Sequence, residues 1–393
     1  MGAKAPAWIG GSGLGGPDFN AARRLDVAQA LILAALLVLG LMTLFSTSRI
    51  AFTAQAGGVA AGLLVYAAAA AFDYRRLQAA APYLYGLAIL LLLMVEVAGH
   101  VALGAQRWIR VAGVQVEPSE VCKLLVLLTL ANYLARRERV GRREVLVLAG
   151  LGLPPTLLVL YQPDLGTAIV FASLLLGLLF LAGAPRLVLA AIVAGIAAAL
   201  PVVPHLLHGY QRRRLEIFLD PSRDPLGAGY NLIQARIAVG SGGIFGQGWL
   251  HGLQGQLGYV PERTSDFVFA VYAEEFGLLG CLLLLALFAA LGWRIARAAA
   301  VAPDRFGYLV CVGAAVIIFT QVVQNVGMNV GLTPIAGIPL PFISHGRSAL
   351  LTDMALLGLV QSVVLRRRLV SHPDRHAETA LPLTESGTVR LPV

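Results

Sequence analysis

A series of long apolar runs restricts the fold of this chain more than any other feature. A helix needs about 20 mostly apolar residues to cross the hydrocarbon layer of a bilayer, and runs of that length recur along most of the 393 residues. We therefore expect an all-α polytopic membrane domain over 25–368, with about ten transmembrane helices. The runs are 25–46, 51–72, 82–103, 118–135, 144–161, 164–183, 187–206, 266–294, 307–330 and 347–366.

Composition supports a membrane protein over a soluble one. Hydrophobic residues make up 58% of the chain and charged residues 13%, whereas soluble domains are about half apolar and a quarter charged. The net charge of +9 does not indicate nucleic acid, because the basic residues lie mostly in short loops between the apolar runs. Cys122, Cys281 and Cys311 lie inside the runs, so we interpret them as small buried residues and expect no disulfide.

The arginines of the short loops predict the orientation of the chain. These loops all fall on one side of the ten-helix arrangement, and the positive-inside rule makes that side cytoplasmic. We expect both termini in the cytoplasm, no cleavable signal peptide, and outward loops at 104–117, 207–265 and 331–346. The polar tails 1–24 and 369–393 are predicted to be disordered. The arginines are Arg23, Arg24, Arg75, Arg76, Arg136, Arg137, Arg139, Arg142, Arg143, Arg294, Arg297, Arg305, Arg366, Arg367 and Arg368.

The outward loop 207–265 is too long to be a simple connection. Its segment "YNLIQARIAVG" (230–240) has apolar residues at helical spacing, which predicts a short amphipathic helix at the outer membrane interface. The loop is also basic, which suits an anionic substrate such as a lipid phosphate. Binding of lipid headgroups alone explains this charge equally well. The basic residues are Arg212, Arg213, Arg214, Arg223, Arg236 and Arg263.

Carboxylates mark the start of the eighth run, where Asp266 follows Thr264 and Ser265. One interpretation of Asp266 is a helix N-cap. The other is functional: on an ideal helix Asp266 and Glu274 share a face, with Glu274 about 12 Å deeper. This pattern predicts a polar cavity that opens outward and is lined by both carboxylates. Glu275 points away from that face, so we expect it to pair with a neighbouring helix.

The fourth run contains a second set of charges. Glu120 and Lys123 are three residues apart and share a helix face. They form either an internal ion pair that makes their burial tolerable or a site where the lysine reaches a phosphate. Arg107 lies just outside this run and could act with Lys123. Asp164 follows Pro163, and we expect it to cap the sixth helix.

Eight segments of the sequence together resemble the SEDS family of shape, elongation, division and sporulation proteins. Each segment is modest alone, but they occur in order across nearly the whole membrane region. The match to the elongation branch is better than that to the division branch. The segments are "GAQRWI" (104–109), "PSEVCKL" (118–124), "QPDLGTA" (162–168), "YQRRRL" (210–215), "DPLGAGYN" (224–231), "IAVGSGGIFGQGWLHG" (237–252), "VPERTSDFVFAVYAEEFG" (260–277) and "GIPLPFIS" (337–344).

The resemblance implies a peptidoglycan glycosyltransferase that polymerises lipid II at the outer face of the bacterial cytoplasmic membrane during cell elongation. It implies a class B penicillin-binding protein as partner, with membrane lipids and other elongation proteins around it. It places the essential aspartate of the family at Asp266 and further polar positions at Arg107, Glu120, Lys123 and Asp164. The chain departs from the family pattern at Glu117, before Pro118, and at Arg347, where the family usually has glycine.

These expectations combine into one mechanism. Asp266 is the expected catalytic base, and a divalent cation, Mg²⁺ or Mn²⁺, is expected at ligands that the sequence does not assign. Two alternatives remain: a transporter that flips lipid-linked precursors, and a scaffold that only recruits a transpeptidase. The expected substrate-binding residues are Arg107, Glu120, Lys123, Arg212, Arg213, Glu262 and Glu274, and the expected supporting residues are Asp164 and Ser344.

Overall fold

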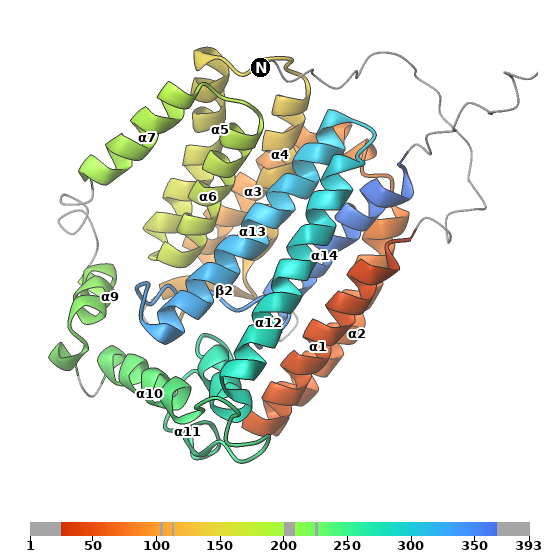
Figure 1. Cartoon of the computed structure of the whole chain (residues 1–393). Helices are drawn as coiled ribbons and strands as arrows, with labels where there is room; N and C mark the ends of the chain where they lie inside the picture. The colour runs from red at the N-terminus through yellow and green to blue at the C-terminus, as the bar shows by residue number, and fades with distance from the viewer. Residues whose placement is uncertain (1–24, 103–104, 112–113, 200–208, 225–226, 368–393) are drawn as a thin grey trace, which may run out of the picture.

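The computed structural model describes residues 25–102, 105–111, 114–199, 209–224 and 227–367. Within these residues, the predicted runs form helices that stand side by side as a bundle (Figure 1). The predicted disordered tails and the end of the seventh run lie outside the described residues. The bundle helices are α1 (Val27–Thr47), α2 (Arg49–Ala71), α3 (Arg76–Ala98), α4 (Pro118–Ala135), α5 (Arg142–Tyr161), α6 (Leu165–Leu181), α7 (Arg186–Ala199), α12 (Val268–Ala300), α13 (Arg305–Val330) and α14 (Arg347–Leu365).

In the described part of the chain, eight of these helices are long and apolar enough to cross a membrane. The other two, α6 and α7, stand where the sequence predicts spans, but they are shorter, with 17 and 14 described residues. Helix α6 begins at Leu165, directly after its cap Asp164, and ends at Leu181, two residues before the predicted limit of 183. The all-α polytopic architecture is therefore confirmed for the membrane region.

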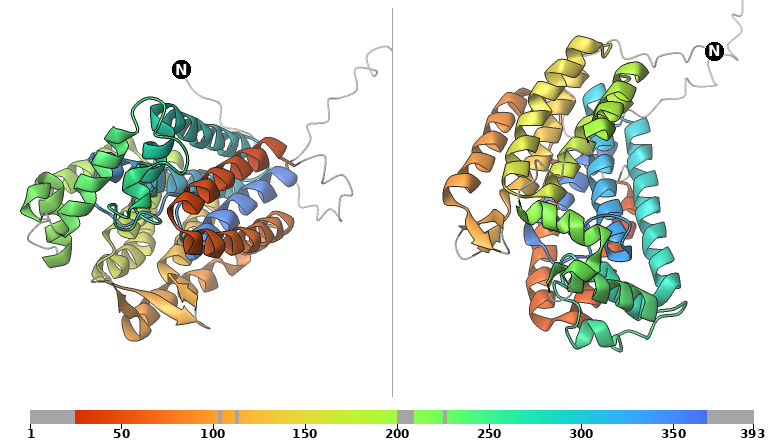
Figure 2. Two further views of the ribbon diagram at one scale, coloured as in Figure 1. Left: turned by 90° about the horizontal axis from the view of Figure 1, so that it is seen from below. Right: turned by 90° about the vertical axis from the view of Figure 1, so that its left-hand side faces the viewer.

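The bundle has inner and outer helices. In α4 and α14, 78% of the most apolar 18-residue window is buried inside the protein, whereas in α2 and α3 the fraction is 22%. The inner helices therefore form the centre, and the outer helices turn apolar side chains outward. Contacts between α2 and α14 and between α3 and α4 join the two sets, as two further views show (Figure 2).

The described part of the predicted outward loop 104–117, with the residues just before it, forms a small antiparallel sheet. Strands β1 (His100–Ala102), β2 (Ala105–Val111) and β3 (Val114–Val116) pair in the order β1-β2-β3. The third helix ends at Ala98, five residues before the predicted limit of 103, because Gly99 adopts an extended conformation. Valine and isoleucine alternate with polar residues beyond that point, a pattern that favours strands.

The long loop 207–265 is folded over the same end of the bundle. It contains α9 (Gly209–Leu219), the short 3-10 helix η2 (Pro221–Arg223), α10 (Ala228–Ser241) and α11 (Leu253–Gln256). Helix α10 confirms the helix predicted from "YNLIQARIAVG" and lies across the bundle rather than along it (Figure 1). Its buried Leu232, Ala235 and Ala238 belong to one apolar cluster with Phe267 and Ala270. The loop therefore packs directly on the start of α12.

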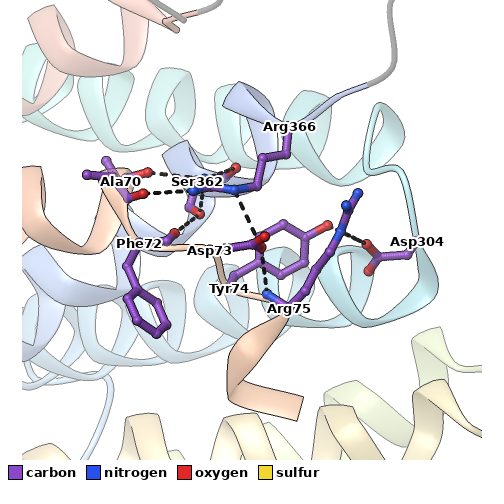
Figure 3. A network of polar contacts seen from close by, with 9 residues as sticks. Ala70, Phe72, Asp73, Tyr74, Arg75, Asp304, Ser362 and Arg366 are labelled. Carbon is purple, nitrogen blue, oxygen red and sulfur yellow. Dashed lines mark hydrogen bonds and ion pairs between the residues drawn. The ribbon is translucent and has the colours of Figure 1, made fainter. Parts of the chain in front are cut away.

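The opposite end of the bundle is tied by a polar network (Figure 3). Arg366, after α14, donates to the backbone oxygens of Ala70 and Ala71 and forms an ion pair of 3.4 Å with Asp73. The buried Tyr74 hydroxyl donates to Asp304, which also pairs with Arg75 at 3.1 Å. These contacts join the turn after α2, the turn before α13 and the end of α14. Arg75 and Arg366, two of the arginines that predict the cytoplasmic side, thus also hold the helix ends together.

Candidate functional site

A polar cavity of about 340 Å³ opens at the end of the bundle that carries the sheet and the long loop. Four parts of the chain that are distant in sequence form its wall: the sheet, α9, the turn before α12 and the segment that leads into α14. Predicted residues Asp266 and Glu262 lie in this wall together with Arg347. The lining residues are Trp108, Gln115, Glu117, Arg214, Glu262, Thr264, Ser265, Asp266, Gly337, Pro339, His345, Gly346, Arg347, Ser348 and Ala349.

The backbone of Asp266 is held by two buried asparagines of α13. The side-chain amides of Asn325 and Asn329 each donate to the Asp266 carbonyl oxygen at 3.0 Å. Asn329 also accepts from the backbone N–H of Ala270 at 3.1 Å. The N-cap of α12 is Phe267, not Asp266. The N-cap interpretation of Asp266 is therefore wrong, and the residue lines the cavity instead.

A serine joins the segment before α14 to the turn that carries Asp266. The Ser344 hydroxyl donates to the Ser265 carbonyl oxygen at 2.6 Å and accepts from the backbone N–H of Leu340 at 2.8 Å. The backbone N–H of His345 donates to the Thr264 carbonyl oxygen at 2.7 Å. The structure therefore gives Ser344 the supporting position that the sequence predicts.

Arg214 and Arg347 bring positive charge to the cavity. Arg214 is half-buried and donates to the Ile335 carbonyl oxygen at 3.2 Å, which fixes its direction. Arg347 is exposed and is the first residue of α14. Its backbone is helical, so this position does not need the freedom of glycine. Burial, together with the charge of Arg347, lowers the pKa of His345 from its usual 6.5, which leaves this ring neutral at neutral pH.

The two predicted arginines Arg212 and Arg213 do not line the cavity. Arg212 pairs with Glu216 at 3.0 Å along the exposed side of α9, and Arg213 pairs with Asp224 at 3.2 Å. Successive residues of a helix point in different directions, so only one member of the "RRR" run faces the cavity. That member is Arg214. Arg107 lies in β2, and its side chain is outside the described part of the structure.

Glu120 and Lys123 form an ion pair of 2.6 Å inside the bundle, with side chains 3% and 1% exposed. Neither residue lines the cavity. Removing one partner would leave an uncompensated charge in the apolar interior, which is costly. Of the two interpretations of this pair, the structure favours the internal ion pair, with no direct contact to a phosphate in the cavity.

Glu274 lies elsewhere than the sequence predicts. It is fully buried, and its carboxylate accepts from the backbone N–H groups of Gln254 at 2.7 Å and Gly255 at 3.0 Å. The expected shared face with Asp266 fails because α12 begins at Val268, so Asp266 is not part of the helix. Glu275 accepts from the Ser46 hydroxyl of α1, as the expected pairing with a neighbouring helix requires.

The predicted cap of α6 is present in the structure. Asp164 caps α6, because its side chain accepts from the backbone N–H of Thr167 at 3.1 Å, which confirms the structural role. Sequence analysis did not predict Trp108, Gln115 or Ser348 as cavity residues, and it noted Glu117 only as a departure from the family. No local pattern marks these four, because the sheet brings Trp108 and Gln115 to the cavity, while Glu117 and Ser348 reach it from the starts of α4 and α14.

The fold and the cavity define a class, that of multi-pass membrane proteins with a charged site between their loops. The sequence predicts that these loops face outward. The model of one family, described as "Cell cycle protein" and comprising FtsW, RodA and SpoVE, matches residues 24–369. This chain belongs to that family.

Relatives of known name agree with the family. The chain is 42% identical over 357 residues to the peptidoglycan glycosyltransferase MrdB of Escherichia coli K12, covering 88% of this chain and 95% of that protein. It is 36% identical over 280 residues to the stage V sporulation protein E of Bacillus subtilis 168, covering 70% and 75%.

Solved structures have the same fold. The rod shape determining protein RodA of Thermus thermophilus is 31% identical with a TM-score of 0.68, over 88% of this chain and 98% of that chain. A second structure has a TM-score of 0.76 and 34% identity over 87% and 98%. It is described as "Structural coordination of polymerization and crosslinking by a peptidoglycan synthase complex".

Proposed function

We propose that the cavity is the site where lipid II is joined into glycan strands, with Asp266 as the general base. The chain is a peptidoglycan glycosyltransferase: the family covers residues 24–369, and relatives of that name match this chain over most of their length. One observation supports the proposal that Asp266 is the general base. Asp266 lies in the wall of a polar cavity to which Arg214 and Arg347 also contribute.

The chemistry requires a base at one side of the reacting carbon. A sugar 4-hydroxyl of one lipid II attacks the anomeric carbon of another chain, a new C–O bond forms, and the bond to the lipid pyrophosphate breaks. A hydroxyl is a weak nucleophile at neutral pH. A positioned carboxylate that takes its proton accelerates such a step by about 10²–10⁴-fold. Asp266 has this role, and in-line attack inverts the anomeric centre.

The leaving group requires positive charge on the other side. A departing pyrophosphate gains negative charge in the transition state, and cations fixed beforehand stabilise it. Arg214 and Arg347 supply that charge here, because a guanidinium suits bidentate contact with phosphate. Arg214, held by the Ile335 carbonyl oxygen, is the more fixed of the two.

A divalent cation, Mg²⁺ or Mn²⁺, would add charge at the pyrophosphate when bound. Among the described residues, no three His, Cys, Asp or Glu side chains are grouped as an all-protein metal site requires. Mg²⁺ commonly uses one or two carboxylates and completes its shell with substrate phosphates and water. Glu117 and Glu262 in the cavity wall fit this second arrangement and would hold the ion.

The setting of the enzyme completes the proposal. The chain is a multi-pass membrane protein, and we place it in the bacterial cytoplasmic membrane with both termini in the cytoplasm. The lipid tail of the substrate would lie between helices and the sugars in the outward cavity. A class B penicillin-binding protein is the proposed partner. The similar structure of a complex that coordinates polymerization and crosslinking supports this partner.

Polymerisation in detergent tests the proposed reaction against a flippase and a scaffold. The purified full-length chain, with and without a class B penicillin-binding protein, is incubated with lipid II and Mg²⁺ or Mn²⁺. We expect glycan strands on a gel, because an enzyme needs no second compartment. A flippase or a scaffold would leave lipid II unchanged. Absence of strands under all of these conditions, from folded protein, would contradict the proposed reaction.

A further inference from the structure

Helix α12, an apolar helix, is broken eleven residues beyond Asp266 in sequence. Gly277 has a φ of 64° and a ψ of −166°, so two half-helices meet there. In an unbroken helix the N–H groups of Leu278 and Leu279 would donate to the carbonyl oxygens of Glu274 and Glu275. The break separates these partners. Unpaired backbone groups inside a membrane protein cost several kcal/mol each, on the order of the transfer free energy of a peptide group.

A glycine-rich segment of the long loop, 243–248, takes the place of the missing partners. Leu278 N–H donates to the Gly243 carbonyl oxygen at 2.9 Å, and Leu279 N–H donates to that of Ile244 at 3.1 Å. On the other side of the break, Gln247 N–H donates to the Glu274 carbonyl oxygen at 2.9 Å, and Gly248 N–H to that of Glu275 at 3.0 Å. The segment therefore bridges the two half-helices by hydrogen bonds.

Glycine allows this close approach. A Cβ at Gly246, where φ is 82°, would lie 2.1 Å from the Glu275 carbonyl oxygen. A Cβ at Gly277 would lie 2.2 Å from the backbone nitrogen of Gly246. Of the two side chains before the break, Glu274 accepts from backbone N–H groups of α11 in the loop, whereas Glu275 accepts from Ser46 of α1. The first half-helix is thus bound to the loop by its backbone and by the Glu274 side chain.

We infer that segment 243–248 positions the first half of α12, and through it Asp266, in the catalytic cavity. The half-helix 268–276 is held near its start by Asn325 and Asn329 of α13 and at its end by segment 243–248. Its position therefore depends on the loop as well as on the second half-helix. Segment 243–248 acts as a positioning element. The inference rests on the proposed role of Asp266.

A pair of matched glycine substitutions tests the inference in the full-length chain. Gly246→Ala adds a methyl group that meets the backbone of α12. Gly183→Ala is the control: Gly183 has nearly the same φ, 86°, but nothing within 4 Å of the added atom, and it lies in the turn after α6. Both variants place alanine at a similar positive φ. We expect Gly246→Ala to lower kcat by about 10–100-fold, since a displacement of about 1 Å can cost that much. KM for lipid II should stay within about threefold, because its direct contacts remain.

A second pair covers the case in which Gly246→Ala does not fold. Leu278 begins the second half-helix, a position that tolerates proline, and its side chain is 53% exposed. Leu278→Pro removes only the N–H that reaches Gly243, whereas Leu278→Ala keeps it. We expect a fall in kcat of about fivefold for the proline variant alone, in keeping with one lost hydrogen bond of about 1 kcal/mol.

Two outcomes would overturn the inference. One is a folded Gly246→Ala variant with kcat within twofold of the Gly183→Ala control. The other, decisive if Gly246→Ala does not fold, is equal kcat for Leu278→Pro and Leu278→Ala. Failure of the proposed function gives a different pattern, in which Asp266→Asn itself polymerises lipid II at the parent rate. The two failures are therefore distinguishable.

Discussion

Asp266→Asn is expected to lower the rate of lipid II polymerisation by about 10²–10⁴-fold, the contribution of a general base. The fold should survive, because the backbone carbonyl of Asp266 accepts from Asn325 and Asn329 of α13, and asparagine keeps that carbonyl group. The measurement is the initial rate of strand formation per folded protein, together with the unfolding temperature.

Glu262→Gln is the matched control for that variant. Glu262 lies in the same cavity wall and loses the same charge on substitution. If only the loss of negative charge in the cavity mattered, the polymerisation rates of the two variants would decrease by the same factor. We expect Glu262→Gln to retain more activity than Asp266→Asn and to respond to a higher concentration of the divalent cation. A near-parent rate for Asp266→Asn would show that Asp266 is not the base.

Arg214→Ala is expected to weaken lipid II binding by about 10–100-fold, which corresponds to a hydrogen bond to a charged group of about 1.5–3 kcal/mol. Arg347→Ala and Arg347→Gly should show a smaller loss, about threefold, because Arg347 is exposed and its charge is screened by solvent. The measurement is KM or direct binding of lipid II at constant ionic strength.

Arg212→Ala is the control for both arginines. It lies two residues before Arg214 on α9 but pairs with Glu216 away from the cavity, with 56% of its side chain exposed. We expect parent-like binding. Equal losses for Arg212→Ala and Arg214→Ala would mean that the loop attracts lipid II by its overall charge. Unchanged binding in both Arg347 variants would assign that residue to contact with lipid headgroups.

The membrane architecture was predictable because it depends on local properties. Apolar length alone marks each span, and apolar residues at helical spacing in 230–240 mark α10. Caps are also local, which is why Asp164 was predicted correctly. The sheet after α3 was harder to predict, since the apolar residues Val101, Ala102 and Leu103 are compatible with helix or strand.

The cavity was predictable only in part because contacts between distant segments define it. Asp266 was found through the family resemblance and its place before an apolar run. Arg214 was not separated from Arg212 and Arg213, because the sequence does not show which side of α9 faces the bundle. The predicted position of Glu274 was wrong because the predicted helix begins at 266, whereas α12 begins at Val268. Asp266 therefore lies outside the helix and does not share a face with Glu274. The break at Gly277 depends on a partner segment about 30 residues earlier.

Photo-crosslinking of lipid II tests most directly the claim that the substrate occupies the cavity beside Asp266. A photoreactive phenylalanine analogue replaces Gln115, an exposed cavity residue, or Glu216, which lies on α9 outside the cavity. The account predicts that labelled lipid II attaches to the chain at position 115, that unlabelled lipid II competes, and that position 216 gives little product. Equal labelling at both positions, or labelling at 115 that unlabelled lipid II does not reduce, would contradict it.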